Sequence, residues 1–409
     1  MFTRKRQVYM DHASATPLDK AVFRAMEPLW SKTSSNPHAL HKGGVAALAE
    51  VEKARAMLAR ALGAHSDELI FTSGGTESNN VALLGVVQAF KIKHPETKPH
   101  VIVSAIEHSS IIETAKALEK SNVDVSYLVP NEDGIVDPKE LAKLLRKETI
   151  LVSVMYANNE VGTIQPIKEI AKTLRHFRKT LYKEKTLLFK PEYPYLHTDA
   201  VQAVSYLETS VEKLGVDMLT LNASKIYGPK GVGLLYVKRG VQLSPIMYGG
   251  DQEKGIRPGT LPTPLIVGFA KALELTVQIR DKESLRLQKL QTYFFERLKK
   301  EIPQIQINGS VTERIPNNVH IALPHFDSEL VLLELDAKGI AASAKSACKS
   351  HDPLASYVIM NVRKDLDAVT LENTAFTRFS MGRTITTKDI DYVVATLKSI
   401  VEKYSRFNS

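Results

Sequence analysis

The sequence predicts an α/β protein whose core is a mainly parallel β-sheet. Two observations support this fold class. Short apolar stretches alternate with amphipathic helical stretches up to about residue 263, which is the pattern of consecutive βαβ units. Beyond that point a long helical stretch precedes more widely spaced strands, which is typical of a smaller α+β unit. We therefore expect a large parallel-sheet part followed by a smaller mixed part.

The individual elements follow from local patterns. A helix is expected over residues 43–62, because apolar residues from Val45 to Leu62 recur on roughly one face. Apolar runs predict strands at 69–72, 100–106, 150–156, 195–198, 217–221 and 232–237. In the C-terminal part we expect helices over 265–301, 328–337 and 388–404, and strands at 318–323 and 376–380. The irregular stretch 183–195 is interpreted as an inserted surface loop.

Composition excludes several classes of protein. The chain has 409 residues and a formal charge of +9, with its basic residues spread along the sequence, so we favour a solvated basic surface over a nucleic-acid site. We find no apolar run long enough to span a bilayer and no signal-type apolar core, so we expect a cytoplasmic protein. The single cysteine, Cys348, allows neither an internal disulfide nor a multi-cysteine metal cluster, and no metal site is expected.

Polar residues follow the predicted strands at their carboxyl ends, where open α/β sheets bind ligands. A glycine- and hydroxyl-rich turn at 73–78 predicts a phosphate-binding helix N-terminus. The later strands are followed by His108, Asn159, Asp199 and Lys225. Each alone has an ordinary explanation, such as a helix cap or a solvated lysine. Together they are the set that pyridoxal 5′-phosphate (PLP) requires, since it needs an amine, a carboxylate, a flat neighbour and phosphate donors.

The chain resembles the NifS/IscS-type cysteine desulfurases, which belong to the class V aminotransferase-like PLP enzymes of fold type I. The resemblance runs nearly end to end, and its motifs lie at residues 9–17, 71–80, 158–162, 225–231, 257–262 and 378–383. It implies a seven-stranded, mainly parallel sheet in a large PLP-binding domain over 18–275. It also implies a smaller α+β domain, made of 1–17 and 276–409, that carries the catalytic cysteine loop.

The resemblance also assigns roles by position. Lys225 would bind the cofactor aldehyde and later move the substrate Cα proton, Asp199 would pair with the pyridine nitrogen, and His108 would stack on the ring and act as acid and base. Further cofactor contacts are implied for Gly75, Thr76, Asn159, Gln202, Asn222, Ser224 and Thr260. Thr260 would reach the phosphate of the other subunit, which implies a homodimer. The substrate carboxylate would be held by Asn36, Asn159 and Arg378, because a bidentate arginine suits a planar anion.

The resemblance finally gives Cys348 a chemical role. Its thiolate, favoured by Lys345 and Lys349, would take sulfur from L-cysteine as a persulfide, leave L-alanine and pass the sulfur to an acceptor such as an iron–sulfur scaffold or a tRNA-thiolation protein. A selenocysteine lyase, another C–S lyase of this fold and a PLP-fold scaffold without desulfurase activity remain alternatives. A nucleic-acid-binding protein on a degenerate enzyme fold is a further hypothesis, for which the sequence offers no motif.

Three departures from the family pattern bear on these roles. The run Asn222-Ala223-Ser224 stands where the family commonly has Ser-Gly-His before the lysine, which predicts altered cofactor retention. Lys345 replaces the usual glycine of the cysteine loop. The chain also ends soon after its last predicted helix, whereas many relatives continue into a tail that engages an iron–sulfur scaffold, so the sulfur acceptor stays open.

Overall fold

The computed structural model describes residues 6–31, 34–183, 193–344 and 356–405. The described residues form a seven-stranded sheet in which β8 runs antiparallel to its neighbours β2 and β7, and the other pairs are parallel. In spatial order the strands are β2 (Leu69–Thr72), β8 (Gly233–Val237), β7 (Met218–Asn222), β6 (Tyr195–Asp199), β5 (Thr149–Ser153), β3 (His100–Ser104) and β4 (Asp124–Leu128). The predicted fold class is confirmed.

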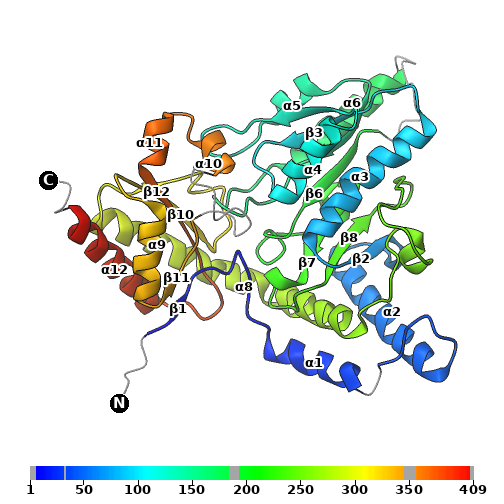
Figure 1. Cartoon of the computed structure of the whole chain (residues 1–409), viewed down its shortest axis with the longest axis horizontal. Helices are drawn as coiled ribbons and strands as arrows, with labels where there is room; N and C mark the ends of the chain where they lie inside the picture. The colour runs from blue at the N-terminus through cyan, green and yellow to red at the C-terminus, as the bar shows by residue number, and fades with distance from the viewer. Residues whose placement is uncertain (1–5, 32–33, 184–192, 345–355, 406–409) are drawn as a thin grey trace.

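Helices cover both faces of this sheet (Figure 1). One face packs against α3 (Gly75–Lys93) and α4 (Ser109–Glu119). The opposite face packs against α1 (Lys20–Ser31), α2 (Lys42–Leu62), α5 (Pro138–Leu144), α6 (Ile167–Lys183) and α7 (Val211–Leu214). Alternate strand residues serve the two cores: Phe71 and Val152 lie in one, and Ile70 and Leu151 in the other. Burial on both faces explains why these strands are continuous apolar runs.

A separate core forms around a smaller antiparallel sheet. In this sheet β10 (Asn318–Pro324) lies between β12 (Thr374–Ser380) and β9 (Gln306–Ile307). Near it, β1 (Val8–Tyr9) pairs in parallel with β11 (Ile340–Ala341), so the N-terminal residues pack with the C-terminal part. The helices of the C-terminal part after residue 301 are α9 (Ser328–Ala337), α10 (Tyr357–Val362), α11 (Ala368–Glu372) and α12 (Thr387–Ser405).

Helix α8 (Thr263–Glu301) runs from the large sheet to the core of the small sheet (Figure 1). Its first half buries Ile266 and Phe269 in the large core, and its second half buries Leu290 and Phe294 in the small one. The helix is continuous, so the boundary near residue 275 stays a prediction. No helix of the described residues combines the length and apolarity that a membrane crossing needs.

Candidate active site

A cavity of about 220 Å³ lies at the carboxyl ends of the large sheet's strands, beside β12 of the small sheet. Among the described residues, nine of those predicted from the sequence line it: Gly75, Thr76, His108, Asn159, Asp199, Gln202, Asn222, Lys225 and Arg378. Ala13, Ser14, Asn79, Met155 and Val201 complete the lining. Most of these residues follow strands of the large sheet, and they lie together because parallel strands bring their carboxyl ends to one edge.

The glycine-rich turn after β2 starts helix α3, as predicted. Gly74 is the N-cap residue and has no side chain to cap the first turn, so backbone amides and the dipole of a 19-residue helix are presented to the cavity at Gly75 and Thr76. Gly233 on β8 packs directly under this turn, because a Cβ at that position would lie 2.6 Å from the Gly74 backbone. The close approach of two glycines positions the turn.

Asp199 ends β6 with its carboxylate buried. One oxygen accepts the Val201 backbone N–H at 3.0 Å, and the other accepts the Asn79 side-chain amide at 2.8 Å. The same Asn79 nitrogen lies 2.9 Å from Ser110 Oγ. The carboxylate is thereby held in one orientation at the cavity wall.

His108 is the N-cap residue of α4, and its Nδ1 accepts the Ser110 backbone N–H at 3.2 Å. The Ser110 hydroxyl lies 2.8 Å from the same ring nitrogen. Burial lowers the pKa of His108, the Asp199 carboxylate opposes this shift, and the Lys225 ammonium adds to it. The net shift favours the neutral imidazole at the cavity.

Lys225 ends a 3₁₀ turn that follows β7, and its amine donates to the Ser14 carbonyl. Asn222 caps this turn, because its side-chain oxygen accepts the Ser224 backbone N–H at 3.2 Å and the Ser224 hydroxyl at 3.1 Å. The Ser224 hydroxyl therefore bonds to Asn222, and Ser224 does not line the cavity. Gln202 donates from its side chain to the Ala13 carbonyl at 3.0 Å.

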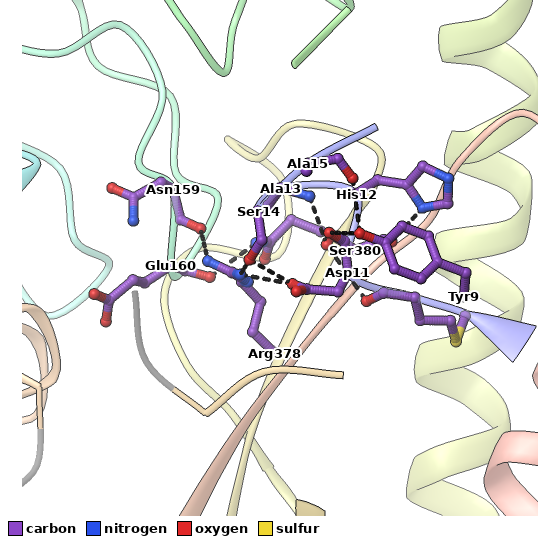
Figure 2. A network of polar contacts seen from close by, with 12 residues as sticks. Tyr9, Asp11, His12, Ala13, Ser14, Ala15, Asn159, Glu160, Arg378 and Ser380 are labelled. Atoms are coloured by element: carbon purple, nitrogen blue, oxygen red, sulfur yellow. Dashed lines mark hydrogen bonds and ion pairs between the residues drawn. The ribbon is translucent and has the colours of Figure 1, made fainter. Parts of the chain in front are cut away.

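Arg378 reaches the cavity from β12 of the small sheet and is held on two sides (Figure 2). Its Nη1 donates to the Asn159 carbonyl at 2.8 Å, and its Nη2 donates to Asp11 Oδ1 and Ser14 Oγ at 2.8 Å each. Among the described residues, Arg378 Nε and Asn159 Oδ1 are buried without a hydrogen-bond partner. The Arg378 Nε–H thus remains for an acceptor such as a carboxylate, and Asn159 Oδ1 remains for a hydrogen-bond donor.

Glu107, next to His108, is fully buried behind the cavity. Its Oε1 accepts the Met155 backbone N–H at 2.6 Å and the Ser104 hydroxyl at 2.8 Å. Its Oε2 has no partner among the described residues. Burial raises the pKa of this carboxyl to about 8, which favours the protonated form at neutral pH.

Three predicted residues stand apart from the cavity, and one lies outside the described structure. Asn36 is exposed and accepts the His38 backbone N–H at 3.0 Å, and Thr260 is also exposed. The third is Ser224, whose hydroxyl bonds to Asn222. Cys348 lies outside the described residues. The sequence argument did not single out Asp11, Ser14 or Asn79, although all three fall inside the recognised motifs.

Comparisons with known proteins cover nearly the whole chain. The family description "Aminotransferase class-V" matches residues 8–393. The chain is 40% identical over 399 residues to a cysteine desulfurase IscS of Dictyoglomus turgidum, covering 98% of this chain and 95% of that protein. It is 39% identical to a cysteine desulfurase IscS of Methanosarcina thermophila, covering 98% and 93%. A solved NifS-like protein superposes with a TM-score of 0.85 at 30% identity, covering 97% of this chain and all of that one.

Proposed function

The chain belongs to the aminotransferase class-V family and is a cysteine desulfurase, and on that premise we propose that it takes sulfur from L-cysteine in the cavity between Lys225 and Arg378. The observation that carries the proposal is the convergence of a lysine amine, a buried carboxylate, an imidazole and a buried guanidinium on this one cavity. These groups come from distant parts of the chain, and a solely structural role for all of them would leave that convergence unexplained.

The donor set fits PLP. The N-terminus of α3 at Gly75 and Thr76 suits a phosphate, and the Asp199 carboxylate suits a protonated pyridine nitrogen. Lys225 supplies the amine for the aldehyde, and His108 and Gln202 lie in the same wall. An apolar cavity of about 150 Å³ holds a benzene ring, so this volume admits a substituted ring. When bound, PLP would supply an electron sink that acidifies the Cα–H bond of an amino acid.

The chain's own residues would bind and orient the substrate. Arg378 offers its buried Nε–H to the carboxylate of L-cysteine, and the Asn159 side-chain oxygen beside it can accept a hydrogen bond from a donor group of the ligand. Asp11 and Ser14 hold the guanidinium from the opposite side, so its plane is set before the substrate arrives. Asn36 stays a predicted contact, because it lies away from this cavity within one chain. The Lys225 amine is in position to move the Cα proton.

Cys348 is proposed as the sulfur nucleophile. Ser343 pairs through its backbone with Arg378, and the Tyr357 hydroxyl donates to the Glu107 carbonyl beside His108. Both Ser343 and Tyr357 therefore bond to residues at or beside the cavity wall. Cys348 lies five positions after Ser343 in the sequence, and at roughly 3.5 Å per position an extended chain could span at most about 17 Å. The thiolate would attack the substrate Sγ. An S–S bond would form as the Cβ–Sγ bond breaks, and protonation of the remainder would give L-alanine.

The wider setting of this activity is proposed on the same grounds. An iron–sulfur scaffold or a tRNA-thiolation protein would accept the sulfur, and the protein would act in the cytoplasm as a homodimer. Thr260 is exposed in the single chain, as a residue that completes the phosphate site of a partner subunit must be.

Alanine release from L-cysteine tests the proposal. Wild type is expected to release alanine faster with a thiol reductant and to gain the mass of one sulfur atom at Cys348. Lys225→Ala and Cys348→Ala should abolish this release, while Lys230→Ala, an exposed lysine five residues on, should not. Wild type that binds PLP without making alanine would refute the proposal. Alanine production that survives Cys348→Ala would identify a C–S lyase instead.

A further inference from the structure

The orientation of His108 is set by a chain of hydrogen bonds that begins at Asp199. A backbone N–H can only donate, so the Ser110 N–H requires a lone pair on His108 Nδ1, at 3.2 Å. Nδ1 therefore carries no proton. In the neutral imidazole the proton must then sit on Nε2, the nitrogen on the other edge of the ring.

Ser110 reinforces that tautomer through its hydroxyl. Ser110 Oγ lies 2.9 Å from the Asn79 side-chain nitrogen and 2.8 Å from His108 Nδ1. Because Asn79 donates to this oxygen, the single hydroxyl proton is available to Nδ1. Both atoms of Ser110 that face the ring thus act as donors to the same nitrogen.

Asn79 has its orientation imposed by Asp199. A carboxylate oxygen at 2.8 Å only accepts, so the amide NH₂ must face it, and the second N–H points to Ser110. Asn79 is 1% exposed, and its Oδ1 has no partner among the described residues. Asn79 leaves its acceptor without a partner while both of its N–H donors are bound, which indicates that the hydrogen bonds to Asp199 and Ser110 determine its orientation.

We propose that Asn79 and Ser110 are positioning residues that lock His108 in its Nε2-protonated tautomer, so that a ligand in the cavity would meet an N–H donor and not the base that the resemblance implies. The partner for such a donor is an electron-rich atom, and the negatively charged sulfur of a substrate thiolate is the chemistry it favours. The tautomer stands on geometry alone, whereas the sulfur as partner rests on the proposed function.

Nitrogen NMR of the full-length protein as purified, labelled with ¹⁵N-histidine, tests the lock directly. His108→Gln assigns the signal. Wild type is expected to favour Nε2–H by about tenfold or more, the ratio that one hydrogen bond of ordinary strength imposes. Ser110→Ala keeps the backbone N–H at Nδ1 but loses the hydroxyl donor, so the excess of the Nε2–H tautomer should fall by the several-fold that one hydrogen bond contributes. Ser110→Thr should restore the wild-type ratio, and Ser109→Ala should leave it unchanged.

Two results would overturn the proposal. One is a wild-type His108 that carries its proton on Nδ1, and the other is a Ser110→Ala variant with the wild-type ratio. Asn79→Ala gives an independent measurement. Loss of the amide donor frees the Ser110 hydroxyl from its fixed orientation, so the excess of the Nε2–H tautomer should also fall. The spectra do not depend on turnover. A protein that shows the Nε2-protonated tautomer but makes no alanine would therefore refute the proposed function and leave the proposal about Asn79 and Ser110 intact.

Discussion

Replacing Glu107 by glutamine tests whether the buried carboxyl behind His108 is protonated. The pKa of this group rises from an ordinary 4.5 to about 8 because burial disfavours the charged form. Between those values the folded state keeps a proton that the unfolded state has released. Stability from this group is therefore fully present below about pH 4.5 and is lost as the pH rises to about 8.

The magnitude follows from the linkage relation. Each pH unit in that window removes about 1.4 kcal/mol from the free energy of unfolding, or about 3 kcal/mol from pH 5.5 to 7.5. A chain of 409 residues has an unfolding entropy of about 0.9 kcal/mol/K, so the loss equals about 3 °C in Tm. Glu107→Gln resembles the protonated acid and has no such dependence.

Parallel thermal unfolding of wild type and Glu107→Gln at several pH values measures the difference. The Tm of wild type minus that of the variant is expected to fall by about 3 °C from pH 5.5 to 7.5. Glu132→Gln, an exposed carboxyl, controls for the loss of one charge. A Tm difference that stays constant with pH would refute the reasoning, as would the absence at pH 7 of a protonated-carboxyl infrared band that Glu107→Gln removes.

Three further predictions concern the cavity. Gly233→Ala places a Cβ 2.6 Å from Gly74, so it should weaken PLP binding at least tenfold in a fluorescence titration, and unchanged affinity would contradict the proposed phosphate turn. Arg378→Lys loses the planar fork and should raise KM for cysteine about 10- to 100-fold with PLP affinity retained; an unchanged KM would remove Arg378 from the substrate site. Thr260→Ala should lower PLP retention without changing the sedimentation of the proposed homodimer, and full retention would argue against a contact across subunits.

Much of the fold was predictable because its signals are local. The helix expected over 328–337 and the strand over 69–72 match α9 and β2 residue for residue, since apolar periodicity marks both. The strand expected over 100–106 ends earlier, at Ser104. β4 was not predicted from its own residues, because this half-buried strand, Asp124–Leu128, lacks a continuous apolar run. The antiparallel direction of β8 was also not predicted, since nothing in a strand's own sequence states its direction.

The candidate site divides in the same way. Lys225, Asp199 and His108 were found because each follows a recognisable strand, and the structure brings them to one cavity. Asn79 and Asp11 were missed, because their roles depend on partners at distant positions: Asn79 donates to Asp199, and Asp11 binds Arg378. A side chain's own sequence neighbourhood carries no signal for such a partner.

The sequence by itself determined the order of the main helices and of the strands with continuous apolar runs, the kinds of group at the strand ends and the family, because these depend on local periodicity and on contiguous motifs. Only the tertiary structure decided which groups meet. Arg378 lies more than 200 residues from Asn159 and more than 300 from Asp11, yet it binds both, because the small sheet packs the two ends of the chain together beside the large one. The Ser110 hydroxyl that faces His108 is likewise oriented through Asn79 and Asp199, 120 residues apart, because a hydrogen bond depends on atoms within about 3 Å in space and not on distance along the chain.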